Sequence, residues 1–122
     1  MANANAAVYV SWGNAIPGRE AKSLEVFMGA VEYYSRLEKE GKIAALHTYL
    51  ATNGNTQHFG GFMILEGEVD QLRTLVDSEE YKTILYKARH LVEDVNVVHC
   101  VTGAEVAKSI QTVVSVRKQL GI

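Results

Sequence analysis

Two side chains that can exchange protons or hydrogen bonds, His47 and Tyr49, alternate with small residues in the segment Ala44–Ala51. Alternate residues of a strand share a face, so His47 and Tyr49 lie on the same side as Ala45 and Ala51. The small residues leave volume, and the imidazole and phenol can orient a carbonyl or carboxylate. This pattern predicts part of a pocket. The alternative is that both side chains are satisfied by neighbours or exposed at a sheet edge.

A second polar group lies near the end of the helical pattern that precedes the last predicted strand. There Arg89 and His90 flank an apolar stripe, where a guanidinium beside an imidazole can hold the anionic end of a ligand. Side chains at such positions are more often simply solvated. Because catalysis near neutral pH needs a base, His47 and His90 are the catalytic candidates. Trp12 and Asn14, where the first strand ends, can cap the predicted ligand pocket.

Other kinds of site have no support in the spacing. His47 and His99 fall on opposite edge strands of the predicted sheet, about 15 Å apart by strand spacing, so they cannot share a metal within one chain. The sequence has no phosphate-binding loop, nucleophile elbow or zinc pattern. We therefore expect neither a metal nor a cofactor. The acidic pair Glu79-Glu80 is explained by a helix start.

Composition indicates one domain spanning residues 1–122. The 122 residues are 48% hydrophobic and 21% charged, with a net charge of −2 and no run of five basic residues. Nucleic acid and membrane surfaces are therefore disfavoured as partners. The start MANANAAV lacks the basic and apolar parts of a signal peptide, so we expect a cytoplasmic protein. The lone cysteine, Cys100, is expected to be a small buried hydrophobe.

Periodicity predicts eight elements. Asp77 and Glu80 are expected to form a capping box at the start of the third helix. Gly41 is placed to end the first helix, and Asn53-Gly54 favours a hairpin loop. The predicted elements are strand Ala6–Trp12, helix Arg19–Lys39, strands Ile43–Ala51 and Phe59–Leu65, short helix Asp70–Val76, helix Asp77–Val92, strand Val95–Val101 and helix Ala104–Leu120.

This order predicts an α+β, ferredoxin-like fold. Right-handed crossovers arrange a βαββαβ core, about residues 6–102, as an antiparallel sheet of strand order 4-1-3-2, with an extra helix at about 104–120. The helices cover one sheet face, yet the strands are apolar on both, and the last strand reads as covered on both sides. Self-association through the second face, giving a homodimer, is therefore expected.

Several of these segments also carry a family resemblance. The run Phe59–Gly67, the helix start Asp77-Ser78-Glu79-Glu80-Tyr81, then Arg89 and Val95–Val98, resemble the dimeric α+β barrel superfamily, and within it small uncharacterised domains. Antibiotic-biosynthesis-type monooxygenases are more distant relatives. The resemblance implies two subunits that face their sheets together and a cleft in each between sheet and helices. No catalytic signature of the superfamily maps completely onto the chain.

The function predicted first is a homodimeric small-molecule-binding protein. Its ligand is expected to be apolar or aromatic with one polar or carboxylate end. The alternative is a cofactor-independent monooxygenase or isomerase of an aromatic or enolisable compound, and a purely structural dimer is the third reading. The residues predicted to form the cleft are Trp12, Asn14, Phe27, Met28, Val31, Tyr34, His47, Tyr49, Leu85 and Arg89.

Overall fold

The computed structural model describes residues 4–122 and contains one four-stranded antiparallel sheet. The central strands β1 and β3 pair with each other, and β2 and β4 form the edges, in the order β2-β3-β1-β4. This is the predicted order 4-1-3-2 read from the other edge, so the ferredoxin-like fold is confirmed. The strands are β1 (Ala6–Trp12), β2 (Ala45–Leu50), β3 (Gly61–Gly67) and β4 (Asn96–Val101).

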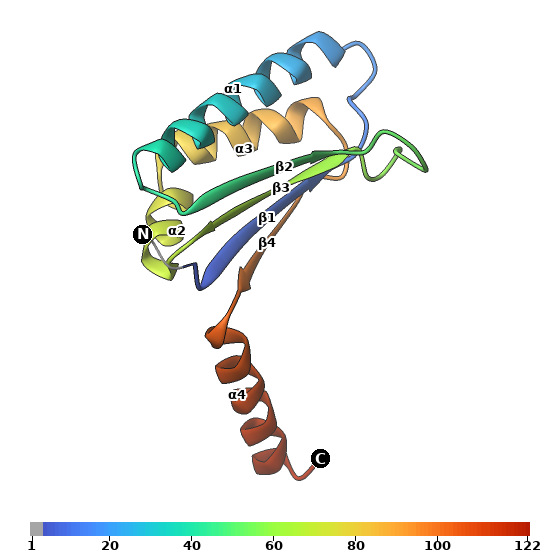
Figure 1. Cartoon of the computed structure of the whole chain (residues 1–122). Helices are drawn as coiled ribbons and strands as arrows, with labels where there is room; N and C mark the ends of the chain where they lie inside the picture. The colour runs from blue at the N-terminus through green and yellow to red at the C-terminus, as the bar shows by residue number, and fades with distance from the viewer. Residues whose placement is uncertain (1–3) are drawn as a thin grey trace.

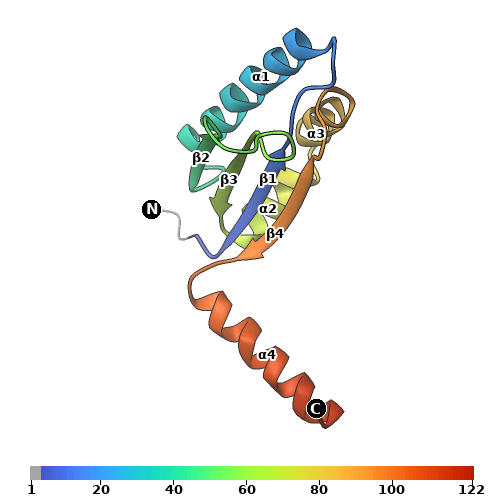
Figure 2. The same cartoon turned by 90° about the vertical axis from the view of Figure 1, so that its right-hand side faces the viewer.

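Three helices cover one face of this sheet, and the fourth leaves it (Figure 1). The helices are α1 (Glu20–Lys39), α2 (Val69–Val76), α3 (Glu79–Leu91) and α4 (Ala104–Leu120). α1 and α3 lie side by side above the strands, with α2 near the end of the sheet. α4 extends away from the other elements, as Figure 2 also shows. Within residues 4–122, no helix combines the length and apolar character needed to cross a bilayer.

The core lies between the sheet and these three helices. Val8 and Leu65 face each other across β1 and β3 and are 2% and 0% exposed. Strand alternation sends Met63 to the same face, where Tyr34 and Leu37 of α1 meet it. Burial of these side chains is the main stabilising contribution to the fold.

The opposite side of the sheet, here called the open face, is also apolar. Cross-strand pairing places on this side Ala7, Tyr9, Ser11, Ala45, His47, Tyr49, Phe62, Ile64, Glu66, Asn96, Val98 and Cys100. Phe62 stacks on Tyr49 with ring centroids 4.6 Å apart and also contacts Tyr9 at 5.5 Å. No element among the described residues covers this face. The apolar second face inferred from the strand sequences is present.

Two expectations about β4 are wrong for the single chain. β4 was predicted to be covered on both sides, yet only one face of the sheet has helices and β4 lies at an edge, so most of its residues are exposed. Cys100 is exposed for the same reason. β3 also begins at Gly61 rather than Phe59 and continues to Gly67, which pairs with Ala6.

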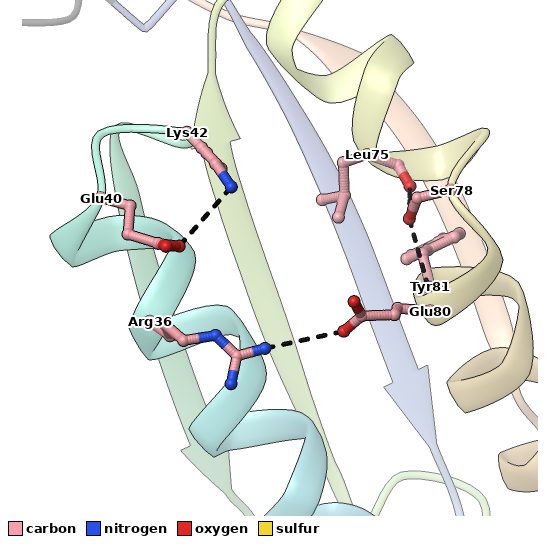
Figure 3. Close-up of polar contacts among 7 residues, drawn as sticks. All are labelled: Arg36, Glu40, Lys42, Leu75, Ser78, Glu80 and Tyr81. Carbon is pink, nitrogen blue, oxygen red and sulfur yellow. Dashed lines mark hydrogen bonds and ion pairs between the residues drawn. The ribbon is translucent and has the colours of Figure 1, made fainter.

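The predicted capping box at Asp77 is also wrong. The cap of α3 is Ser78, whose Oγ accepts from the Tyr81 N–H at 3.3 Å and donates to the Leu75 carbonyl at 2.6 Å (Figure 3). Asp77 instead ends α2. Glu80 reaches Arg36 of α1, with 3.6 Å between nitrogen and oxygen, and so bridges the two helices. In the sequence, both Asp77 and Ser78 are possible N-caps of α3. Because Asp77 already ends α2, Ser78 takes the N-cap position.

Replacing the two candidate caps separately tests this arrangement. Ser78→Ala should lower the free energy of unfolding by about 1 kcal/mol, because an N–H at the start of α3 loses its acceptor. Asp77→Ala should change it by less than about 0.5 kcal/mol. Urea denaturation of both variants measures the difference. A larger loss in Asp77→Ala than in Ser78→Ala would contradict the observed cap.

Candidate functional site

A cavity of about 280 Å³ lies between the helix-covered face of the sheet and helices α1 and α3. β1, α1, α3 and the residues after α3 contribute to its lining. Its walls are mostly apolar. Among the residues that line it are Val10, Trp12, Phe27, Ala30, Tyr34, Met63, Tyr81, Ile84, Leu85, Ala88 and Val95.

The indole of Trp12 forms one wall of this cavity because Gly61 leaves it room. Trp12 pairs with Gly61 across β1 and β3, and its ring lies 5.6 Å from the Phe27 ring, centroid to centroid. A Cβ on Gly61 would lie 2.8 Å from Trp12 Cζ2 and 2.6 Å from the Tyr49 carbonyl oxygen. Both distances are too short, so a larger residue at position 61 would displace the indole or the β2 backbone.

Two buried phenols are the main polar groups of the cavity. Tyr34 and Tyr81 are each 4% exposed and both line it. Among the described residues, the Tyr81 hydroxyl has no hydrogen-bond partner. Burial, together with the neighbouring Tyr81, raises the pKa of Tyr34 well above its ordinary value. Burial also raises the pKa of Tyr81, which Arg89 partly opposes. Both phenols are therefore neutral hydrogen-bond donors at neutral pH.

Only part of the predicted cleft comes together in this cavity. Trp12, Phe27, Tyr34 and Leu85 line it. Val31 packs against the core without being one of the lining residues. Met28, predicted as a wall residue, is 58% exposed, because it lies on the outer side of α1.

His47 and Tyr49 do not join this group, since both lie on the open face. His47 Nε2 lies 3.7 Å from Glu66 Oε1, and Tyr49 stacks on Phe62. The pocket predicted around His47 and Tyr49 therefore does not form on the helix side. The alternation within β2 fixes which residues share a face but not which face meets the helices.

The remaining three predicted residues lie outside the cavity lining. The backbone of Asn14 links two loops, since its N–H donates to Gln57 at 3.0 Å and its carbonyl accepts from Glu93 at 2.9 Å. Arg89 stacks on Tyr86, 5.8 Å from the ring centroid. His90 Nδ1 lies 2.7 Å from the carbonyl oxygen of the same Tyr86, one turn earlier. Neither catalytic candidate, His47 or His90, thus reaches the cavity.

A pair that sequence reasoning missed lies beside the cavity wall. His58 Nδ1 and Asp94 Oδ2 are 2.7 Å apart, and both side chains are exposed. Gly13 lines the cavity, and a Cβ placed on it would lie 3.2 Å from Asp94 Oδ2 and 3.2 Å from His58 Cα. The two residues come from different loops, 36 positions apart, so no local spacing signals them. The positive φ of Asp94, 56°, is the only backbone peculiarity at this pair.

The described residues offer no metal site. Between residues 4 and 122 there is no group of three or more His, Cys, Asp or Glu side chains that could hold an ion. The cavity combines mostly apolar walls with two neutral phenols, Tyr34 and Tyr81, among its lining residues.

Several solved structures have a fold similar to that of this chain. A dimeric ferredoxin-like protein of unknown function from Bacteroides fragilis matches with a TM-score of 0.58 and 11% identity, over 84% of this chain and all of that one. A protein of unknown function from Bacteroides thetaiotaomicron, described as a possible oxidoreductase, matches with a TM-score of 0.58 and 17% identity, over 83% of this chain and all of that one.

SnoaB, a cofactor-independent oxygenase from Streptomyces nogalater, matches with a TM-score of 0.53 and 13% identity, over 83% of this chain and 94% of its own. No protein-family model and no curated protein sequence matches this chain. The chain thus shares the ferredoxin-like fold of these proteins. At these identities the likeness shows the fold alone.

Two glycine variants test how Gly61 shapes the cavity. Gly61→Ala should lower the free energy of unfolding by about 1–3 kcal/mol, because the new methyl group collides with Trp12 and the β2 backbone. Gly29→Ala is the control: nothing lies within 4 Å of its added Cβ, and alanine should stabilise α1 by about 0.5–1 kcal/mol. Denaturant unfolding monitored by fluorescence of Trp12, the only tryptophan, measures both. Equal effects would show that the Gly61 contact is unimportant.

Proposed function

We propose that this chain is a small-molecule-binding protein whose ligand occupies the cavity between the sheet and helices α1 and α3. One observation carries the proposal: an apolar cavity is lined by Tyr81, whose buried hydroxyl has no partner in residues 4–122. An unsatisfied buried donor is costly, so a ligand that accepts its hydrogen bond gains that energy on binding. Few polar groups in a largely apolar pocket is the usual composition of a ligand site.

The cavity favours a ligand with a neutral acceptor, such as a carbonyl oxygen, over one with a carboxylate. Arg89, His47 and His90, the cations that the sequence suggested for an anionic end, do not line it. A carboxylate buried without a cation is strongly disfavoured. The cavity volume of about 280 Å³ limits the ligand to a small or medium-sized molecule, such as a substituted aromatic.

The same proposal includes a homodimer formed through the open face. Tyr9, Tyr49 and Phe62 make a continuous aromatic cluster there, and an exposed apolar face of this extent is expected to bind a partner. The Bacteroides fragilis protein of the same fold is dimeric, which supports this assembly. A two-fold contact would place the aromatic cluster of one chain against that of its partner.

Filling the cavity tests the ligand site. Ala88 lines the wall, so Ala88→Phe should occupy the space and abolish binding of a neutral apolar fluorophore such as 1-aminoanthracene. Lys87→Phe adds the same ring outside the cavity and should leave binding within about twofold. Tyr81→Phe should weaken carbonyl-containing ligands by about tenfold, the value of about one hydrogen bond. Unchanged fluorophore binding in Ala88→Phe would contradict the proposed site.

A charge on the open face tests the dimer. Wild-type chain at micromolar concentration should scatter light as a species of about twice 13.4 kDa. Phe62→Glu should remove cooperative folding rather than give a soluble monomer, because separation exposes the apolar face. Tyr86→Glu, at an aromatic residue 54% exposed on α3, should remain dimeric. A wild-type mass near 13.4 kDa would contradict the dimer.

A second candidate, a cofactor-independent oxygenase or isomerase, is favoured by the fold shared with SnoaB and by the His58–Asp94 pair beside the cavity wall. Such chemistry needs a base, and the neutral phenols of Tyr34 and Tyr81 are poor bases. Oxygen uptake over dihydroxyaromatic substrates distinguishes the classes. Turnover that is lost in His58→Ala but kept in His47→Ala, on the open face, would establish the enzyme. We expect no turnover in the wild type.

A further inference from the structure

Helix α4 has an apolar side that nothing among residues 4–122 covers. At 100° per residue, one side of the helix collects the α4 stripe, and Lys108, Thr112 and Ser115 lie on the other. The stripe residues are between 41% and 66% exposed, and no residue of α4 is buried within the described chain. The α4 stripe consists of Val106, Ile110, Val113, Val114 and Leu120.

The turn before α4 directs the helix away from its own body, defined as residues 4–102. Gly103 has φ +59° and ψ −135°, a backbone conformation that residues other than glycine rarely adopt. The preceding Thr102 N–H donates to the Asn5 carbonyl at 2.9 Å, which anchors the start of the turn to the sheet. Figures 1 and 2 show the helix pointing away from the sheet in both views. The α4 stripe therefore cannot fold back onto its own body without changing this turn.

The stability of α4 depends on packing of its apolar side. Most helical stability in proteins comes from such packing, and Val113, Val114 and Val116 are β-branched residues that lower the intrinsic helix propensity of α4. The C-terminal end of α4 is stabilised locally. Gly121 forms a left-handed C-cap at φ +71°, and the positive charges of Arg117 and Lys118 in the last turn favour the helix dipole. The missing contribution is burial of the stripe.

The net charges of α4 and of the remaining residues indicate which surface the α4 stripe packs against. α4 has one acid, Glu105, and three bases, Lys108, Arg117 and Lys118, so its formal net charge is +2. Since the whole chain carries −2, the remaining residues carry −4. Two α4 helices together would repel each other, whereas α4 and the body attract. Arg117 also lies within the apolar side, where a second Arg117 would be a poor neighbour.

We propose that α4 is an exchanged arm, which packs the α4 stripe against the body of a second copy of this chain beside the sheet-to-sheet contact. The inference rests on the proposed homodimer and adds a second contact to it. The open face and the α4 stripe, which residues 4–122 of one chain leave uncovered, are then both buried by the same partner. Each chain gives an arm and receives one.

A stripe variant of the full chain tests the arm. Ile110→Gln with Val113→Gln removes two apolar side chains, while glutamine favours helix more than isoleucine or valine, so loss of α4 itself is not the cause of any effect. The matched control is Thr112→Gln with Ser115→Gln on the opposite side of α4. Analytical ultracentrifugation should show a dimer dissociation constant raised by about tenfold or more in the stripe variant and unchanged in the control.

Hydrogen exchange of the wild-type protein and both variants identifies the surface that receives α4. Slow exchange at residues 110–114 in the wild type, with faster exchange in the stripe variant both there and in β2 or β4, supports the arm. Free exchange of α4 in the wild type overturns it. Faster exchange confined to α4 indicates pairing between two α4 helices and also overturns it. A monomeric wild type defeats the homodimer itself, whereas a dimer equally stable in both variants defeats only the arm.

Discussion

The structure depends on a sheet with two apolar faces and enough helix to cover only one of them. β1 and β3, the central strands, carry Val8 and Leu65 toward the helices and Tyr9 and Phe62 away from them. Because strand residues alternate, every residue that strengthens the core has a neighbour on the open face. The helical layer, formed by α1, α2 and α3, lies wholly on one side. The need to bury the second side is thus built into the strands that form the core.

The cavity has its own cause, which lies in the sizes of the residues between the sheet and the helices. Ala30 of α1 and Ala88 of α3 bring short side chains to the wall, next to the large rings of Trp12 and Tyr34. Gly61 allows the indole to lie across β3. A core with uniformly large aliphatic residues would close this space. The space is therefore encoded by a few small residues among large ones, and the phenol of Tyr81 is the feature that gives it chemical character.

Sequence reasoning predicted the architecture, and four of the residues that it assigned to a cleft line the cavity. Helical and strand periodicities fixed the element order, and chirality then left one natural sheet order. In β2, however, the sequence does not decide whether the face with Leu46 or the face with His47 is buried. Only the packed structure shows that Leu46 faces the helices. The pair His58–Asp94 joins the loop between β2 and β3 to the loop between α3 and β4, so its proximity depends on how the fold brings these two loops together. No local spacing encodes such a contact.

The choice between binding and catalysis depends on proton affinity inside the cavity. Burial of Tyr34 and Tyr81 stabilises their neutral forms, so these phenols hold their protons and donate hydrogen bonds rather than remove a proton from a ligand. A catalyst of this fold would need a group that accepts a proton at the reacting atom. His58 is the imidazole beside the wall, and its partner Asp94 already occupies one ring nitrogen. Under the proposed function, the cavity would therefore hold an apolar molecule by one neutral acceptor, and chemistry on that molecule would need a base that neither buried phenol supplies.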